Sequence, residues 1–175
     1  MTHGNSVPHK NIVLAGFMGT GKTTVGRLVA GRLGWRFMDT DDVITARDGR
    51  TVAEIFEQDG EAVFRQLESA ACRDKAALCH QVIATGGGAL LDPRVCAACA
   101  AHGLVICLTC DLDEIIRRIG DDPARPLFTP DRDRLARLLA ARADHYARLP
   151  HHIDTTHSSP AQAAEEVIRV WQQNR

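Results

Sequence analysis

The stretch Gly-Phe-Met-Gly-Thr-Gly-Lys-Thr, residues 16–23, decides the fold of this chain, because it has the pattern of a phosphate-binding P-loop. An apolar run at 12–15 precedes it, and apolar side chains then recur at helical spacing over 25–33 until Gly34 stops the pattern. The order is therefore strand, glycine-rich loop, helix. Backbone amides in such a loop turn toward phosphate oxygens at the positive end of the helix. The sequence thus predicts that the chain binds a nucleoside triphosphate with Mg²⁺.

Beyond this loop, short apolar stretches alternate with segments of helical periodicity. The predicted strands lie at 12–15, 35–38, 82–84, 104–108 and, more weakly, around Ile153. The predicted helical segments lie at 25–33, 64–71, 112–119 and 164–171, and Thr51 to Glu54 forms a capping box at a further helix start. This alternation predicts a parallel sheet that is covered on both faces, with ligands at the carboxyl ends of the strands.

The composition excludes several classes of function. The chain has 175 residues, the size of one domain, and 21 Lys and Arg residues against 22 Asp and Glu leave a formal charge of -1. That balance provides no field for a polyanion, so we expect no nucleic-acid partner. No apolar run has the length of a signal peptide or a membrane span, so we expect no membrane contact and a cytoplasmic location.

Six cysteines raise the question of zinc, since two pairs have Cys-x-x-Cys spacing. Cys107 and Cys110 sit at the end of a predicted strand, where residues three apart point to opposite faces. Cys96 and Cys99 lie in an Ala-rich helical stretch. We therefore favour buried thiols over a tetrahedral zinc site.

Two carboxylates follow the second predicted strand. Asp39 and Asp41 are two apart in what reads as an extended stretch, so both side chains should project to one side at the mouth of the sheet. One could organise Mg²⁺, and the other could hold and deprotonate an acceptor hydroxyl. The alternative is a helix N-cap, a role open to Thr40 or Asp42.

Two other features have a functional and a purely structural interpretation. Gly86, Gly87 and Gly88 follow a strand directly, where a bare backbone allows a ligand to approach closely, but a flexible turn would look the same. Arg65 precedes Glu68 by three residues on one helical face, and a surface ion pair is the usual explanation of that spacing.

A long polar segment at 120–133 interrupts the alternation and contains Pro123, Pro126 and Pro130. Such a loop inside a compact domain suits a mobile lid, and it carries Arg125. Arg142 lies on a later predicted helix. Each arginine alone could be a solvated surface residue, but together they suit a carboxylate-bearing acceptor, which guanidinium forks bind with paired hydrogen bonds.

From residue 11 to about residue 171 the chain resembles the shikimate kinase family. The motifs are residues 16–26, Phe-Met-Asp-Thr-Asp at 37–41, residues 55–68 ending in Phe-Arg-Gln-Leu-Glu, Ala-Thr-Gly-Gly-Gly-Ala at 84–89, Arg-Pro-Leu-Phe at 125–128 and Arg-Ala-Asp-His-Tyr at 142–146. The resemblance implies a three-layer α/β P-loop fold like that of nucleoside monophosphate kinases, with a five-stranded parallel sheet. It also implies one domain over 1–175, a substrate-binding region at about 41–78 and a mobile lid at about 120–133.

The resemblance further implies ATP-dependent phosphorylation of the 3-hydroxyl of shikimate, in aromatic amino-acid biosynthesis. It assigns catalysis to Lys22, Asp41 and Arg125, and shikimate binding to Asp41, Arg65, Gly86, Gly87, Gly88 and Arg142. It assigns ATP binding to Gly19, Thr20, Gly21, Lys22, Thr23, Thr24, Arg118, Arg125 and Pro160, and Mg²⁺ binding to Thr23 and Asp39.

Two rival hypotheses stay open at this point, and we expect a monomer under each. In the first, the arginines recognise a phosphate, as in another small-metabolite or nucleotide kinase; the carboxylates at Asp39 and Asp41 argue against an anionic acceptor there. In the second, the chain is a nucleotide-regulated switch; the sequence lacks the Asn-Lys-x-Asp motif that recognises guanine.

Overall fold

The computed structural model describes residues 10–120 and 131–174, which form a five-stranded sheet between two layers of helices. The strands are β1 (Asn11–Gly16), β2 (Arg36–Asp39), β3 (Gln81–Ala84), β4 (Gly103–Thr109) and β5 (His151–Asp154). They pair in the order β2-β3-β1-β4-β5, and every pairing is parallel. The predicted parallel sheet is confirmed, including the weak fifth strand.

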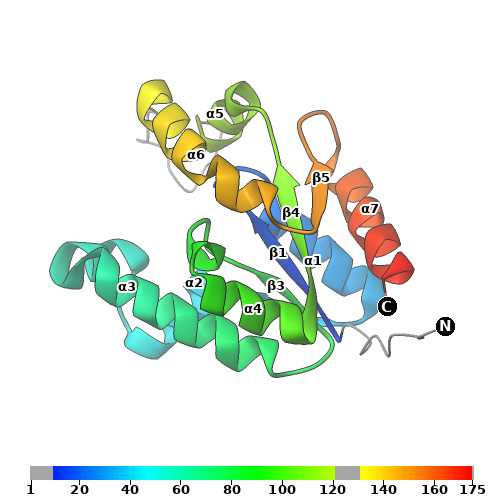
Figure 1. Ribbon diagram of the computed structural model, residues 1–175, viewed down its shortest axis with the longest axis horizontal. Coiled ribbons are helices and arrows are strands. Elements are labelled where there is room, and N and C mark those ends of the chain that lie inside the picture. The colour runs from blue at the N-terminus through cyan, green and yellow to red at the C-terminus, as the bar shows by residue number, and fades with distance from the viewer. Residues whose placement is uncertain (1–9, 121–130, 175) are drawn as a thin grey trace.

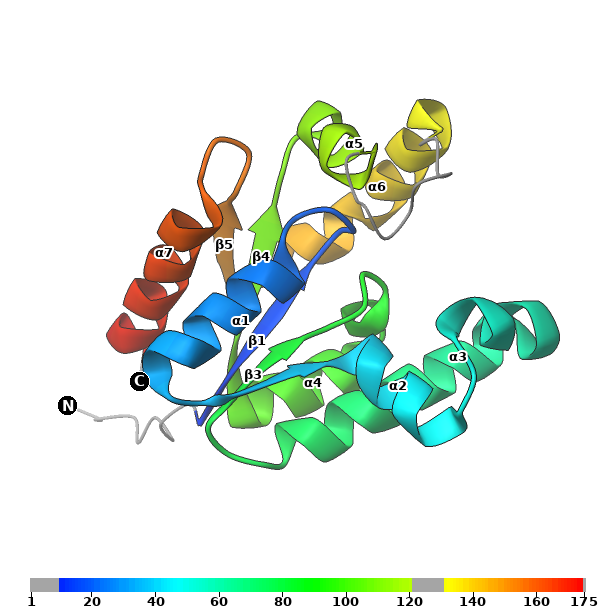
Figure 2. The same ribbon diagram turned by 180° about the vertical axis from the view of Figure 1, so that it is seen from behind.

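The helices cover both faces of the sheet (Figures 1 and 2). They are α1 (Lys22–Leu33), α2 (Thr40–Asp48), α3 (Val52–Ala76), α4 (Pro93–His102), α5 (Leu112–Gly120), α6 (Arg132–Ala147) and α7 (Pro160–Gln173), with a short 3-10 helix η1 (Ala89–Leu91). Seen from behind, α1 and α7 lie in front of the sheet (Figure 2). α3 and α4 cover the opposite face, α5 lies beyond the carboxyl end of β4, and α6 runs back from there on the same side as α3 and α4 (Figure 1).

Alternating side chains of the central strand fill two separate cores. Ile12 and Leu14 of β1 pack with α1 and α7, whereas Val13 and Ala15 pack with α3 and α4. All six residues of β1 are buried, as expected for a parallel strand with helices on both faces. This rigid centre fixes the loop that leaves β1 at Gly16.

The pair α2 and α3 extends away from the sheet and has a small core of its own, built on Ile44, Ile55, Phe64 and Ala71. The predicted capping box begins α3: Thr51 accepts from the Glu54 amide, and the Glu54 side chain accepts from the Thr51 amide. Gly60, at φ 81°, interrupts the helix with a kink. The second half of α3 then runs back along the face of the sheet that α4 also covers.

At the amino ends of the strands, aromatic rings close the structure. Trp35 contacts Trp171 of α7 edge-on, with ring centroids 5.0 Å apart and an interplanar angle of 80°. Trp35 also meets the ring of His80, which has a left-handed φ of 58°. This end of the molecule lies opposite the loops that follow the strands. Within the described ranges, no helix is long and apolar enough to cross a membrane.

Candidate active site

The P-loop connects β1 to α1 and leaves the start of that helix open. Gly21 is the N-cap of α1, its φ is 93°, and no side chain caps the helix there. A residue with a side chain would be strained at this φ. The first amides of α1 are thus available to an anion, and the helix dipole favours one.

Lys22 folds over this loop. Its Nζ donates to the carbonyl oxygens of Gly16 at 2.9 Å and Phe17 at 2.8 Å. Burial lowers the pKa of Lys22 to about 8, although the charges of Asp39 and Asp41 oppose the shift. The ammonium group therefore has carbonyl partners but lacks a full counter-charge, which phosphate oxygens could supply.

Thr23 and Asp39 meet across the mouth of the sheet, where Thr23 Oγ1 donates to Asp39 Oδ2 at 2.8 Å. Our explanation for the shared orientation of Asp39 and Asp41 was wrong, because Asp41 is not in an extended stretch. Asp39 is itself the N-cap of α2, and its Oδ1 accepts from the Asp41 amide at 3.1 Å. The two carboxylates lie near each other because α2 begins between them. The N-cap of α2 is Asp39, not Thr40 or Asp42.

Two buried carboxylate oxygens have no hydrogen-bond partner among the described residues: Asp41 Oδ1 and Glu68 Oε1. Burial raises the pKa of both groups, and the charge of Asp39 raises that of Asp41 further. Both oxygens face Gly86, where an added Cβ would lie 3.3 Å from Asp41 Oδ1 and would collide with Glu68 Oε1. Unpaired buried oxygens are costly, so this corner is suited to receive hydroxyl donors.

The Arg65–Glu68 pair is not the surface ion pair that its spacing suggested. Arg65 Nη1 lies 2.6 Å from Glu68 Oε2, and the Glu68 side chain is only 1% exposed. Arg65 Nη2 also reaches Glu61, at 3.0 Å. The kink and the packing of α3 turn this face of the helix toward the glycine loop, which a spacing rule cannot reveal.

The three glycines after β3 bring the arginines of two helices together. A Cβ on Gly88 would lie 2.5 Å from Arg65 Cζ, and a Cβ on Gly87 would lie 3.2 Å from Arg142 Nη1. The Arg142 guanidinium also lies 5.8 Å from the ring centroid of Phe17. A Cβ at Gly88 would displace the Arg65 guanidinium, and one at Gly87 would press on that of Arg142. Side-chain-free backbone thus lets two guanidinium groups border one small volume.

A cleft of about 930 Å³ runs along the P-loop and past the carboxyl ends of the strands. Its lining includes all the described residues of the predicted ATP set: Gly19, Thr20, Gly21, Lys22, Thr23, Thr24, Arg118 and Pro160. Asp39, Asp41, Gly86 and Gly87 line it as well. Arg65, Gly88 and Arg142 are outside this lining and stand beside it, against the glycine loop. Arg125 lies outside the described residues.

At the far end of the cleft, Arg118 joins the P-loop to the loop after β5. Its Nη1 donates to Gly19 O at 3.3 Å, and its Nη2 donates to Thr155 O at 2.6 Å. The Thr155 hydroxyl contacts the carbonyl of Thr20 at 3.0 Å. Pro160 begins α7 at the same place. No sequence signal singled out Thr155, whose part depends on a contact between distant loops.

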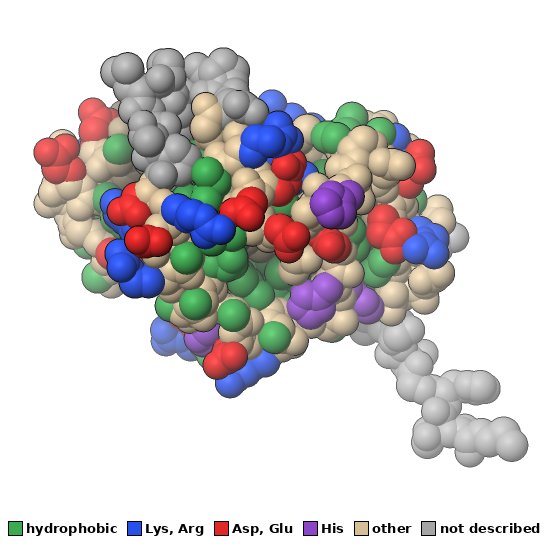
Figure 3. Space-filling model, turned by 90° about the horizontal axis from the view of Figure 1, so that it is seen from above, with side chains coloured by type: hydrophobic (Ala, Val, Ile, Leu, Met, Phe, Trp, Pro, Cys, Tyr) green, Lys and Arg blue, Asp and Glu red, His purple; other side chains and the backbone are tan. Residues whose placement is uncertain are grey.

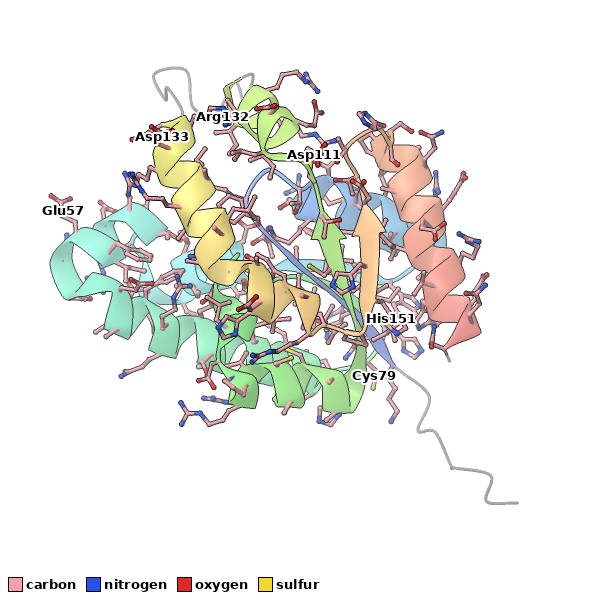
Figure 4. All side chains as sticks on the ribbon, turned by 45° about the horizontal axis from the view of Figure 1, so that its top comes forward. Glu57, Cys79, Asp111, Arg132, Asp133 and His151 are labelled. Atoms are coloured by element: carbon pink, nitrogen blue, oxygen red, sulfur yellow. The ribbon has the colours of Figure 1, made fainter. Side chains whose placement is uncertain are left out.

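Residues on either side of the undescribed segment 121–130 are tied together. Arg132 lies at the start of α6 (Figure 4). It forms an ion pair with Asp113 of α5 at 2.7 Å. From above, acidic and basic side chains of the described residues are interspersed over this end of the molecule (Figure 3). The described part of this face therefore has no extended surface of one charge.

The four cysteines of the two Cys-x-x-Cys pairs belong to one hydrophobic cluster or pack against it, whereas Cys79 is exposed. Cys99 and Cys107 are buried, and Cys96 and Cys110 are partly buried. Cys107 and Cys110 contact the same hydrophobic cluster, because Cys110 follows the end of β4 and the strand alternation that we expected does not reach it. Burial raises the pKa of Cys107 to about 11. In the described ranges, no three His, Cys, Asp or Glu side chains are grouped to hold a metal ion.

Comparisons with known proteins agree with this geometry. The family model "Shikimate kinase" matches residues 18–172. A shikimate kinase of Geobacter sulfurreducens is 44% identical over 93% of this chain and 92% of its own length, and one of Caldanaerobacter subterraneus is 43% identical over 93% and 96%. The structure of a shikimate kinase from Acinetobacter baumannii in complex with shikimate superposes with a TM-score of 0.86, at 32% identity over 95% of this chain and 94% of that one. A sugar kinase from Janibacter, at 20% identity and a TM-score of 0.63, shares the fold. The chain belongs to the shikimate kinase family.

Proposed function

We propose that this protein transfers the γ-phosphoryl group of ATP to the 3-hydroxyl of shikimate, which gives shikimate 3-phosphate and ADP for aromatic amino-acid biosynthesis in the cytoplasm. Family membership supports the reaction. The observation that carries the choice of acceptor is the glycine loop, where two unpaired carboxylate oxygens and two guanidinium groups surround one volume next to the P-loop. A ring that bears both hydroxyls and a carboxylate matches that set.

The donor half of the site is the P-loop with its helix. The open amides of α1 hold the β- and γ-phosphates, and Lys22 turns from the carbonyls of its own loop to the transferring group. Thr23 and Asp39 offer a hydroxyl and a carboxylate oxygen 2.8 Å apart, hard oxygen ligands that fit Mg²⁺. The ion, when bound, offsets negative charge on the phosphates. Arg118 and Pro160 border the adenine.

The acceptor half is built around Asp41. Its unpaired buried oxygen accepts a hydrogen bond from the hydroxyl group that is phosphorylated. The raised pKa of the Asp41 carboxyl group makes the carboxylate a stronger base, as general-base catalysis requires. Arg65 and Arg142 bind the shikimate carboxylate with charge-assisted hydrogen bonds. Phosphoryl transfer depends on such positioning and charge more than on covalent participation by the protein.

Three further parts of the proposal concern the layout of the chain. The whole of 1–175 acts as one domain, the segment 41–78 forms the shikimate-binding region and the segment 120–133 forms a lid. α2 and α3 support the second part, since they hold Asp41, Arg65 and Glu68 on a unit with its own core. Arg125, which we propose for transition-state charge, belongs to the lid.

The proposal is tested by coupled ADP release with shikimate, gluconate and nucleoside monophosphates as acceptors, each at matched concentration. Of these acceptors, we expect only shikimate to give saturable turnover. NMR of the product should show a phosphate ester on the 3-hydroxyl. Equilibrium binding of shikimate separates an enzyme from a nucleotide switch, which would show no saturable affinity. Turnover with a nucleotide but not with shikimate would overturn the proposal.

A further inference from the structure

The glycine loop after β3 is held in place by two buried hydroxyl groups. The Thr40 hydroxyl accepts from the Gly86 amide at 3.0 Å. The Tyr146 hydroxyl donates to the Gly87 carbonyl at 2.6 Å. Both side chains are buried, which limits the access of water to the two hydroxyls. Two peptide units of the loop, Thr85–Gly86 and Gly87–Gly88, are therefore each held by one hydroxyl.

The two hydroxyls belong to the elements that carry the proposed acceptor ligands. Thr40 is the first residue of α2, immediately before Asp41. Tyr146 lies one turn after Arg142 on α6, so both side chains point from one face of that helix. Tyr146 thus links the backbone of Gly87 to the helix that supplies a guanidinium group.

The spacing around this loop leaves little room for displacement. Arg65 approaches Gly88, and Arg142 approaches Gly87, at distances that would not admit a Cβ without a shift of one partner. Because both guanidinium groups stand this close to the loop, a displacement of the loop would change their distances to it. Burial raises the pKa of Tyr146, and the adjacent Arg142 opposes this only in part, so the hydroxyl remains a donor at neutral pH.

We propose that Tyr146 and Thr40 are positioning residues for the acceptor: the Thr40 hydroxyl holds the Thr85–Gly86 peptide and the Tyr146 hydroxyl holds the Gly87–Gly88 peptide, so that the loop, Asp41 and Arg142 keep one arrangement. In this proposal neither hydroxyl contacts the reacting atoms. The expected change in KM rests on the proposed shikimate kinase activity. The anchoring of the loop rests on the loop geometry alone.

The first test is Tyr146→Phe, which removes the hydroxyl and keeps the ring in the core. We expect KM for shikimate to rise roughly threefold to tenfold, the range for the loss of one neutral hydrogen bond. KM for ATP should stay within about twofold, since the P-loop is untouched. A purely structural role would lower thermal stability and leave the two KM values in their original ratio.

A matched control is Thr109→Val, which removes another hydroxyl that donates to a distant carbonyl. Thr109 Oγ1 lies 3.4 Å from Ile153 O, between β4 and β5 and away from the glycine loop. Thr40 offers a second pair of variants: Thr40→Val should raise KM for shikimate as Tyr146→Phe does, and Thr40→Ser, which keeps the oxygen, should restore it. Unaltered KM for shikimate in both Tyr146→Phe and Thr40→Val would overturn the proposal.

Hydrogen–deuterium exchange of the full-length protein without ligands gives a readout that does not depend on activity. We expect faster exchange of amides at 84–91 in Tyr146→Phe and in Thr40→Val, and unchanged exchange there in Thr109→Val. Absence of turnover with shikimate in the parent protein, together with faster loop exchange in the variants, would reject the proposed function and leave the anchoring of the loop established. Unchanged exchange in both variants would reject the anchoring itself.

Discussion

At the scale of single residues, the site contains charges that the folded protein does not satisfy by itself. Asp41 and Glu68 each have a buried oxygen without a partner among the described residues, and Lys22 is buried among carbonyls. Such groups reduce stability, and they are retained where a ligand supplies the missing partner. Removal of the Asp41 charge should therefore change stability and activity in opposite directions.

Asp41→Asn is the simplest case. Because the amide cannot accept the proton of the acceptor hydroxyl, we expect kcat to fall by at least about a hundredfold, whereas the affinity for ATP stays nearly the same. Steady-state ADP release and ATP titration check this. Near-normal kcat would remove Asp41 from the base role.

The same variant should be more stable than the parent at pH 7. The Asp41 pKa is raised above its ordinary value of 3.8, first by burial and then by Asp39, so the folded protein binds the proton more tightly than the unfolded chain does. Stability is therefore lost as pH rises through the interval between the two pKa values. The gain in Tm should shrink as pH falls through the folded-state pKa of Asp41 and vanish below about pH 4, as thermal unfolding across pH would show.

Lys22 predicts proton uptake on ATP binding. Because its pKa is about 8, the Lys22 amine is neutral in much of the unliganded protein at about pH 8.5. Bound phosphates would raise this pKa and restore the positive charge of Lys22. Calorimetry in two buffers of different ionisation enthalpy should detect roughly half a proton taken up, and none at about pH 6. Lys22→Met serves as the control, and the same uptake in that variant would assign the proton to another group.

At the scale of elements, Asp39 has two separable duties. It caps α2, and with Thr23 it offers oxygens to Mg²⁺. Asn caps as well as Asp, so Asp39→Asn should retain stability within a few tenths of a kcal/mol, whereas Asp39→Ala should lose about 1 kcal/mol. Both should need more Mg²⁺ for half-maximal activity. Urea unfolding and Mg²⁺ titration separate the duties, and normal Mg²⁺ dependence in both variants would contradict the metal role.

Two glycines of α1 provide a matched pair for its packing. A Cβ on Gly26 would lie 2.5 Å from Phe37 Cε2, whereas nothing lies within 4 Å of a Cβ on Gly31. We expect Gly26→Ala to destabilise the protein by about 1–3 kcal/mol and Gly31→Ala to stabilise it by roughly 0.5–1 kcal/mol. Chemical unfolding measures the stability of both variants. Equal effects would mean that the contact between α1 and Phe37 of β2 leaves room for a Cβ at Gly26.

The elements that were predictable from sequence are those with local signals. Gly34 ends α1 with a left-handed φ of 66°, and the Thr51 capping box begins α3, as predicted. The capping role of Asp39 was missed because a helix cap and a strand end look alike in sequence. The burial of Glu68 was missed because a pairing rule for isolated helices ignores what packs against them.

At the scale of the whole molecule, the site combines segments that are far apart in the chain. The rule that ligands bind at the carboxyl ends of parallel strands predicted that the loops after β1, β2 and β3 would meet. It could not predict the contributions of α3 and α6, because helix side chains reach the site only through their packing. Arg65 and Arg142 came from the family resemblance, and Tyr146 became evident only from its contact with Gly87.

The distribution of exposed apolar side chains bears on assembly. In the described part of the chain, the large ones are Leu28, Phe56, Val63 and Leu78, which belong to α1, to the two halves of α3 and to the turn after it. No proposed site residue needs a second subunit. We expect a monomer of 19.1 kDa from about 10 to 200 µM by sedimentation. A concentration-dependent shift toward twice that mass would contradict this expectation.

The edge-on contact of Trp35 with Trp171 has a spectroscopic consequence. The chain has two tryptophans, and both stand at the amino ends of the strands, remote from the cleft. Their coupled transitions should give a paired circular dichroism signal that reports whether the carboxyl-terminal helix is packed against the sheet. Intrinsic emission should accordingly respond weakly to substrates and strongly to detachment of the carboxyl-terminal helix, which makes it an optical probe of partial unfolding.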